Sequence, residues 1–504
     1  MASEIFDLAI IGGGINGTGI AADAAGRGLS VVLFEKDDLA SGTSSASSKL
    51  IHGGLRYLEH FEFRLVREAL AEREVLLRRA PHLIRPLRFV IPHGHGMRPR
   101  LLLRAGLFLY DHLAERKRIP ASESLALAHD PAGRPLRPEF KHGFSYYDCW
   151  VDDARLVTTL AIDAAERGAV IHTRAPATQI SQSAGVWHIT AGSGTAPITV
   201  EARALVNAAG PWCAEVAGLV GPASDVPKLR LVRGSHIVVP RIPGAEDAYL
   251  LQSPDGRVVF ALPFEGRFTL IGTTDFPVAT PDEGFTPSEA EETYLLETAA
   301  RFFSRPIARE TIVRRFAGVR PLVEDGARKA AAVSRDYRLD LILQDGAAPL
   351  LNIIGGKITT FRRLAEAALA RLAPFLPGSR RNWTERAALP GGDFGPNGFA
   401  SYCADLARRH PAIDHDVLLR LASLYGTRAV RVLGDAKTLS DLGAPIGAGL
   451  TEREVIYLRD HEWARTPQDV LWRRTKAGLH LNVDEMRRAE ETIAKLLAAA
   501  PSGS

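Results

Sequence analysis

The sequence predicts an α/β fold in which a parallel sheet is interrupted by an antiparallel sheet and followed by an all-helical region. Three observations support this fold class. Short apolar runs ending in glycines or other small residues recur early, midway and late in the chain. Stretches with alternating apolar positions lie between them, and helical periodicity dominates residues 399–499. At about 150 residues per domain, the 504 residues suit two to four domains.

The N-terminal segment has the pattern of strand, glycine turn, helix, strand and acid. An apolar run over residues 6–11 leads into a G-x-G-x-x-G pattern at Gly12, Gly14 and Gly17, and a second apolar run ends at Glu35. The first glycine permits a tight turn, the second lets a pyrophosphate approach the backbone, and the third lets the helix pack on its strand. The helix N-terminus offers N–H groups to phosphates, and the acid can accept hydrogen bonds from ribose hydroxyls. The pattern predicts a bound dinucleotide and leaves NAD and FAD open.

Two later apolar runs, over residues 204–210 and 350–354, return the chain to the same edge of the sheet. Ligands of open α/β sheets bind beyond the carboxyl ends of the parallel strands. The three returns favour FAD, because a flavin lies extended and needs a late segment to hold its isoalloxazine ring. The residues expected to line this passage are Asn207, Ala209, Gly210, Gly355 and Gly356.

The antiparallel sheet is predicted from the alternating stretches 234–239, 257–262 and 268–271. It makes the nucleotide-binding domain discontinuous in sequence. We expect that FAD-binding, Rossmann-type domain in residues 1–90, 145–215 and 340–385, a substrate domain in 91–144 and 216–339, and a helical C-terminal domain in 390–504.

Composition excludes several classes of protein. A net charge of +4, without basic clusters of nucleic-acid-binding type, argues against a nucleic-acid partner. Three cysteines without a C-x-x-C pair argue against a zinc site or a disulfide framework. We expect no signal peptide and no membrane span, because the start lacks a basic and apolar leader and no run of about 18 apolar residues occurs.

Residues 98–118 are apolar in the middle and basic at both ends. This pattern is typical of a helix lying in the headgroup region of anionic lipid, and equally of a buried amphipathic helix. The residues alone do not separate the two interpretations.

Longer motifs sharpen the functional prediction. They are TSSASSKLIHGGLRYL at 43–58, YDCWVDDARL at 147–156, RGSHIVVP at 233–240, IGTTD at 271–275, GVRPL at 318–322, GGKITT at 355–360, DHEW at 460–463 and LWRRTK at 471–476. Together they closely resemble the FAD-dependent, respiratory glycerol-3-phosphate dehydrogenases of the bacterial aerobic type. The resemblance covers almost the whole chain, and it implies a fold similar to D-amino-acid oxidase with an added helical domain.

The resemblance also implies an activity: sn-glycerol 3-phosphate is oxidised to dihydroxyacetone phosphate, and the electrons pass through FAD to membrane quinone. It implies a cytoplasmic homodimer attached peripherally to the inner face of the cell membrane, and it moves residues 98–118 toward contact with anionic lipid. No D-x-D-x-D-G loop occurs in the last hundred residues, so control by calcium is not expected.

Oxidation of a secondary alcohol on a flavin needs a cationic clamp for the phosphate, a proton acceptor, and a geometry that presents the C2 hydrogen to the flavin. Structural ion pairs are the alternative role for the cations of these motifs, and the base stays unassigned between two histidines. Thr274 and Asp275 are expected to cap their turn. The residues expected in the catalytic site are His52, Arg56, Tyr57, His236, Thr273, Arg320, Arg335 and Lys357.

The Ser-rich loop after the second strand is expected to contact the cofactor, although an ordinary flexible polar loop would have the same composition. The further residues expected at the cofactor are Asn16, Thr43, Ser44, Ser45, Ser48, Lys49, Lys357 and Thr359.

Three other functions remain open at this point. A flavin oxidase would pass the electrons to O2 instead of quinone. An amine or amino-acid oxidase would need a clamp for a carboxylate, which the clustered cations disfavour. A non-catalytic flavoprotein or membrane-surface scaffold would need neither substrate cations nor a proton acceptor.

Overall fold

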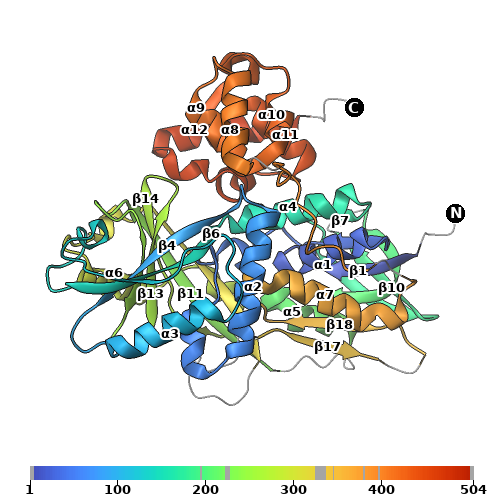
Figure 1. Ribbon diagram of the computed structural model, residues 1–504. Coiled ribbons are helices and arrows are strands. Elements are labelled where there is room, and N and C mark those ends of the chain that lie inside the picture. Colours follow the sequence, from blue (N-terminus) through green and yellow to red (C-terminus); the bar gives the residue numbers. More distant parts are fainter. Residues whose placement is uncertain are drawn as a thin grey trace.

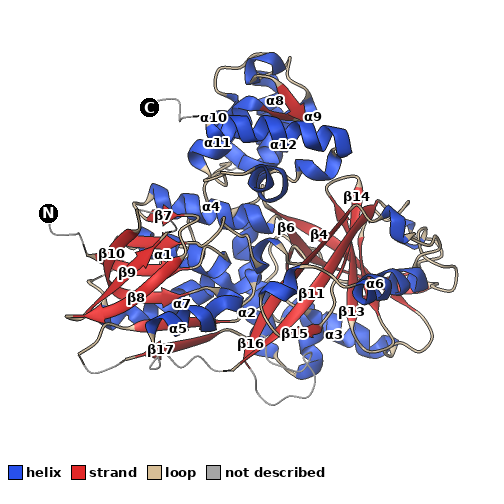
Figure 2. Ribbon diagram, turned by 180° about the vertical axis from the view of Figure 1, so that it is seen from behind, coloured by secondary structure: helices blue, strands red, loops and turns tan. Residues whose placement is uncertain are grey.

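The structure is a computed structural model that describes residues 5–192, 196–221, 228–323, 336–343, 346–378, 381–395 and 398–499. Two large sheets with their covering helices lie side by side, and a helical C-terminal domain stands above them (Figure 1). Figure 2 shows the same three parts from behind.

The first sheet has a parallel centre and antiparallel margins. Its path runs β17-β18-β10-β1-β2-β7, with the β8–β9 ribbon attached to β10. The strands β1, β2, β7, β10 and β18 are parallel, whereas β17 and β9 run antiparallel to their neighbours. The bounds are β1 (Phe6–Ile11), β2 (Val31–Phe34), β7 (Val170–His172), β8 (Ala177–Ser183), β9 (Val186–Ala191), β10 (Ile198–Asn207), β17 (Arg338–Ile342) and β18 (Leu350–Ile354).

Small residues let the helices approach this sheet closely. Helix α1 (Ile15–Gly26) packs between α4 (Asp153–Glu166) and α7 (Phe361–Leu372). A methyl group at Gly19 would lie 2.8 Å from the Phe361 ring, so the Ala- and Gly-rich helix leaves room for its neighbour. Helices α2 (Phe63–Arg79) and α5 (Cys213–Val220) complete the covering layers.

The second sheet is antiparallel apart from the parallel pair β12–β4, which agrees with the predicted antiparallel sheet. Its path runs β15-β11-β14-β13-β12-β4-β6-β3, with β16 beside β11 and β5 beside β6. The strands are β3 (Leu50–Ile51), β4 (Ile84–His93), β5 (Glu123–Leu125), β6 (His142–Val151), β11 (Leu229–Pro240), β12 (Ala248–Gln252), β13 (Val258–Phe264), β14 (Phe268–Gly272), β15 (Phe276–Val278) and β16 (Arg314–Val323). Helices α3 (Arg100–His112) and α6 (Glu289–Phe302) flank it.

The domain ranges expected from the sequence cut through two long strands of this second sheet. The limit at residue 90 falls inside β4, and the limit at 145 falls inside β6, which pairs with β4 along its whole length. The short strand β3 also joins the second sheet, although it lies within the first expected range. The chain therefore passes between the two sheets earlier and more often than composition indicates.

The C-terminal domain has its own hydrophobic core. Its helices are α8 (Gly398–Arg409), α9 (His415–Tyr425), α10 (Ala429–Leu433), α11 (Glu452–His461) and α12 (Val483–Ala498). A small hairpin, β19 (Pro445–Gly447) and β20 (Leu450–Thr451), interrupts the expected all-helical pattern. Its turn contains Gly447 and Gly449 with positive φ angles, which glycine adopts readily.

None of the helices in the described part of the chain combines the length and hydropathy needed to cross a lipid bilayer. The candidate site lies between the two sheets, at the carboxyl ends of β1, β10 and β18.

Candidate active site

Two cavities of about 400 and 250 Å³ adjoin at the carboxyl edge of the first sheet. The first extends over the glycine turn and the end of β2, and the second extends toward β11 and β16. Both are lined by Ile15, Thr43, Ser44, Pro321, Gly355 and Gly356. They therefore form one elongated site, with one end shaped by the first sheet and the other by the second.

Backbone atoms form most of the glycine turn. Gly12 has φ +113°, and a side chain there would meet the carbonyl oxygen of Ala208 at 2.5 Å. A Cβ at Gly17 would lie 1.9 Å from the Gly12 carbonyl oxygen, so α1 can pack on β1 only with glycine at this position. Gly12 and Gly14 line the first cavity, whereas Gly17 lies behind the turn. This arrangement leaves the N-terminus of α1 open toward the cavity.

Glu35 closes the end of β2 and lines the first cavity. Its carboxylate accepts hydrogen bonds from the backbone N–H groups of Gly13 at 2.6 Å and Asp37 at 2.8 Å. Burial raises the pKa of this carboxyl group, and the two backbone hydrogen bonds oppose that shift. The acid thus fixes the glycine turn while facing the cavity.

The Ser-rich loop is ordered by specific hydrogen bonds. Ser44 Oγ accepts a hydrogen bond from the N–H of Ile15 at 3.0 Å, and Thr43 Oγ1 donates one to the carbonyl oxygen of Val319 at 2.6 Å. Ser48 Oγ lies 2.9 Å from Nε2 of His236. Thr43, Ser44 and Ser48 line the elongated site, so this side of the loop faces the space expected for the cofactor.

Ser45 and Lys49 lie on the opposite side of that loop. The Lys49 ammonium is 2.7 Å from Asp153 Oδ1 and donates to the carbonyl oxygen of Ser45. Neither residue lines the two cavities. The resemblance had suggested both as cofactor contacts, whereas the geometry gives Lys49 a role in shaping the loop.

The two asparagines expected at the cofactor have different surroundings. Asn16 lines the first cavity: its Nδ2 donates to the carbonyl oxygen of Gly355 at 3.1 Å, and its Oδ1 is buried without a hydrogen-bond partner among the described residues. Asn207 is fully buried in the sheet and donates to Asn352 Oδ1 at 2.9 Å and to the carbonyl oxygen of Cys213. Ala209 and Gly210 line the first cavity in its place.

Six of the eight residues expected for catalysis line the second cavity. They are His52, Tyr57, His236, Thr273, Arg320 and Lys357, and Thr359 lies beside them. Arg56 precedes Tyr57 in the same turn, but its side chain does not line the cavity. Arg335 lies outside the described residues.

Arg320, on β16, is oriented by the turn after β14. Its guanidinium pairs with the carboxylate of Asp275 and donates to Thr273 Oγ1 at 3.2 Å and to the carbonyl oxygen of Thr274 at 3.1 Å. A Cβ at Gly234 would lie 2.2 Å from Arg320 Nη2, so glycine leaves the space that this guanidinium occupies. Strand β11 and the turn after β14 therefore fix the orientation of this cation on β16.

Lys357 reaches the same cavity from the first sheet. It follows Gly355 and Gly356 after β18, and its ammonium lies 3.7 Å from the centroid of the Tyr57 ring. A cation over a tyrosine face is attracted by the ring electrons. The cavity thus contains a cation from each sheet.

The two candidate proton acceptors differ in environment. His236 is 2% exposed and stacks on Phe316, with ring centroids 5.0 Å apart. Burial lowers its pKa to about 3, and the nearby charges of Arg320 and Lys49 act in the same direction. This low pKa makes His236 a neutral imidazole at pH 7. His52 instead lies in the cavity at the edge of Phe260, with ring centroids 6.4 Å apart.

Several residues at the site were missed or given another role from the sequence. Asp275 pairs with Arg320 instead of capping its turn, and the Thr274 hydroxyl donates to Glu291 Oε1 at 2.7 Å. In the first cavity, Lys36 lies over the Trp212 ring at 3.8 Å. The partners come from distant segments, so no local pattern could have identified them.

The residues present fit an extended dinucleotide. The open helix N-terminus suits a pyrophosphate, the glycines leave space for close backbone approach, and the buried Asn16 Oδ1 can accept a hydrogen bond from a bound group. The elongated shape continues past Gly355 and Gly356 into the cation-lined cavity, as a flavin site requires.

Comparisons with known proteins agree with this geometry. The family described as FAD dependent oxidoreductase matches residues 7–362, and the family described as C-terminal domain of alpha-glycerophosphate oxidase matches residues 382–501. A relative from Pseudomonas aeruginosa, named glycerol-3-phosphate dehydrogenase, is 50% identical over 96% of this chain and 94% of its own. A relative from Brucella abortus, named D-erythritol 1-phosphate dehydrogenase, is 49% identical over 96% of each chain.

Among solved structures, the glycerol-3-phosphate dehydrogenase from Bacillus halodurans complexed with FAD superposes with a TM-score of 0.76. It is 27% identical, and the alignment covers 100% of this chain and 97% of that one. The predicted fold class and the FAD cofactor are thereby confirmed. The glycine turn, the elongated site and these matches over nearly the full length show that the chain belongs to the family of FAD-dependent glycerol-3-phosphate dehydrogenases.

Proposed function

We propose that this enzyme oxidises sn-glycerol 3-phosphate to dihydroxyacetone phosphate and passes the electrons to a membrane quinone. The observation that carries the substrate assignment is the second cavity, where Arg320 and Lys357 face a space beside the glycine edge that the cofactor would occupy. A three-carbon phosphoester needs cations at one end and a proton acceptor near its middle carbon, and this cavity offers both.

Arg320 is the proposed phosphate clamp. A guanidinium can bond two phosphate oxygens at once, and the contacts with Asp275, Thr273 and the Thr274 carbonyl hold it in one orientation. Lys357 adds a second positive charge from the end of β18. Together they favour binding of a dianion and fix which end of the substrate points toward β16.

FAD, when bound, supplies the acceptor for the hydride that leaves C2. The protein must take the hydroxyl proton, and a general base works best when its pKa lies near the working pH. The low pKa of His236 makes it a weak base, so we assign the proton transfer to His52 and hydrogen bonding of the substrate to His236. Replacing His52 by Gln should lower kcat about 100-fold with little change in KM, whereas His236→Gln should raise KM with little change in kcat.

Contact with anionic lipid is the second part of the proposal. Helix α3 exposes Leu101 at 85% and Leu102 at 59%, and the neighbouring turn exposes Phe61 at 78%. Arg100 and Arg104 are exposed on the same helix. Exposed apolar side chains flanked by basic ones suit the headgroup region of a membrane, and Figure 1 shows α3 at the end of the molecule opposite the helical domain.

Vesicle flotation with and without anionic lipid tests this surface, with Leu101→Glu expected to weaken binding. The inner-face location and the homodimer remain predictions.

The relative from Brucella abortus supports a second candidate substrate. Its 49% identity is almost equal to that of the Pseudomonas aeruginosa relative, so overall similarity does not separate a three-carbon from a four-carbon polyol phosphate. Both substrates present a phosphate and a secondary alcohol, and both fit the proposed roles of Arg320 and His52.

The decisive experiment is anaerobic reduction of the purified holoenzyme. We expect glycerol 3-phosphate to bleach the flavin absorbance at lower concentrations than D-erythritol phosphate does, and glycine or sarcosine to have no effect. Rapid reoxidation by a soluble quinone, with little peroxide formed in air, would support the dehydrogenase over an oxidase. A flavin that no polyol phosphate reduces would contradict the proposed function.

A further inference from the structure

The loop between β2 and β3 connects the cofactor site with the helical domain. Its residues 41–44 line the first cavity, and the N–H of Ala40 donates to the carbonyl oxygen of Gly13 at 3.1 Å. Ala40 and Lys49, which bracket the Ser-rich part, have φ +61° and +57°. Residues other than glycine adopt such angles at an energetic cost, so surrounding contacts must impose the loop conformation.

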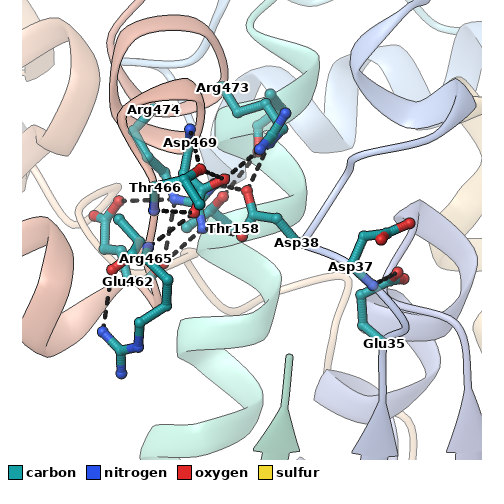
Figure 3. A network of polar contacts seen from close by, with 12 residues as sticks. Glu35, Asp37, Asp38, Thr158, Glu462, Arg465, Thr466, Asp469, Arg473 and Arg474 are labelled. Carbon is teal, nitrogen blue, oxygen red and sulfur yellow. Dashed lines mark hydrogen bonds and ion pairs between the residues drawn. The ribbon is translucent and has the colours of Figure 1, made fainter. Parts of the chain in front are cut away.

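The first such contact is a buried ion pair with the helical domain. The Arg474 guanidinium donates to both carboxylate oxygens of Asp38, each at 2.8 Å, and Arg473 Nε donates to Asp38 Oδ2 at 2.6 Å. Asp38 is 1% exposed and Arg474 is fully buried. Figure 3 shows Asp38 turned away from Glu35 and toward the two arginines. Asp38 is three residues from the acid that closes the cofactor cavity.

A second series of contacts reaches the other end of the loop through the start of α4. Lys476 Nζ donates to Asp152 Oδ2 at 2.5 Å, and the adjacent Asp153 accepts from Lys49 Nζ at 2.7 Å and from Ser47 Oγ at 2.8 Å. The four charged residues of this series are each 5% exposed or less: Lys49, Asp152, Asp153 and Lys476. One side of this turn of α4 therefore contacts the helical domain, and the other contacts the cofactor loop.

Buried ion pairs are weak sources of net stability but define geometry, because an unpaired charge in the interior is very unfavourable. We propose that the helical domain holds the loop in its FAD-binding shape through the Arg474–Asp38 and Lys476–Asp152 pairs, and that Arg474 and Lys476 are positioning residues for the cofactor. The inference rests on the proposed placement of FAD beside this loop. It gives the C-terminal domain a role in cofactor retention.

Arg474→Lys tests the proposal, because lysine keeps the charge and loses the two-pronged contact. The matched control is Arg420→Lys, since Arg420 contacts both carboxylate oxygens of Glu454, at 2.9 and 2.6 Å, entirely within the helical domain. The FAD dissociation constant of apoprotein is measured by the quenching of flavin fluorescence, and the thermal midpoint of the apoprotein is recorded in parallel.

We expect Arg474→Lys to weaken FAD binding about tenfold, a typical size for coupling between two sites. Arg420→Lys should change it by less than about twofold, because the two sites share no partner. A saturating concentration of FAD should restore kcat in Arg474→Lys. Equal changes in FAD affinity for the two variants would overturn the proposal, whatever the thermal midpoints.

A measurement on the wild-type chain covers the case in which the variants do not fold. Coupling is reciprocal, so FAD added to apoprotein should slow hydrogen exchange in residues 462–476 as well as in the loop. Unchanged exchange in 462–476 would refute the inference. Failure of the wild-type protein to bind FAD would instead refute the proposed function, so the two failures are distinguishable.

Discussion

The two ends of the elongated site differ in what lines them: backbone atoms and glycines shape the first cavity, and ionisable side chains line the second. The first cavity is shaped by backbone and glycine, and its polar groups mostly hold the turn itself, as Glu35 and Ser44 do. The second cavity is lined by ionisable side chains contributed by both sheets, with Arg320 on β16 and Lys357 just after β18. At the first end, Gly12 and Gly17 leave no room for a side chain, whereas the second end depends on the orientation of a few charged groups.

This difference separates binding from chemistry. Changes at the backbone end should alter how much FAD the protein holds and leave substrate selection intact in the fraction that is loaded. Changes at the side-chain end should leave FAD content intact and alter turnover or substrate affinity. The comparison would be wrong if variants at the backbone end changed substrate selection, or if variants at the side-chain end lost FAD.

The largest effect is expected for Gly17→Ala. Because the new Cβ would lie 1.9 Å from the Gly12 carbonyl oxygen, α1 must move away from β1 and the pyrophosphate site is lost. We expect FAD affinity to fall about a thousandfold, or about 4 kcal/mol. Gly106→Ala in α3 is the control, because a Cβ there meets nothing within 4 Å and the φ angle of Gly106 is not positive. Normal flavin content in Gly17→Ala would contradict the backbone-shaped description.

A smaller effect of the opposite kind is expected for Arg320→Lys. Lysine keeps the positive charge and loses the fork that can bind two phosphate oxygens, so kcat/KM should fall about 100-fold, or about 2.7 kcal/mol, with FAD content unchanged. Arg315→Lys, on the same strand, is the control because Arg315 pairs with Glu292 and does not line the cavity. Loss of FAD from Arg320→Lys would show that the side-chain end also determines FAD binding, contrary to the comparison.

The same contrast explains what the sequence could predict. The glycine turn, its strands and Glu35 lie within one continuous segment, so spacing alone was enough, and β1 and β18 begin and end where the apolar runs do. The second cavity joins segments from His52 to Lys357. The residues of this cavity were predicted from the family resemblance, because no local pattern brings β11, β16 and the end of β18 together.

Residue type was less informative than residue partner. Lys49 and Asn207 have side chains suited to a cofactor, yet Lys49 pairs with Asp153 and Asn207 with Asn352. Asp38 and Arg474 are 436 positions apart and carry no motif that links them. Such contacts depend on the packing of whole domains, which composition and periodicity do not specify.

Adding a methyl group to the backbone at the side-chain end should lower kcat/KM less than Arg320→Lys does. In Gly234→Ala the new Cβ would approach Arg320 Nη2 at 2.2 Å and Thr273 Oγ1 at 2.6 Å. The guanidinium can shift, so we expect kcat/KM to fall about tenfold, or about 1.4 kcal/mol, with FAD affinity retained. Gly218→Ala in α5 meets nothing within 4 Å and should behave as wild type. An unchanged kcat/KM in Gly234→Ala would show that the orientation of Arg320 does not limit the reaction.

The smallest effect concerns stability, and it follows from burying His236 at the side-chain end. Its pKa is lowered to about 3 in the folded protein, so between that value and the ordinary value of 6.5 the unfolded chain binds more protons. Acidification therefore favours unfolding, and lowering the pH from 7 to 6 should remove about 0.7 kcal/mol through this residue. Comparing the thermal midpoints of wild type and His236→Gln apoprotein at the two pH values measures it, with partly exposed His188→Gln as control. The wild type should lose more stability than His236→Gln on acidification, and equal losses would mean that His236 is not held neutral by its surroundings.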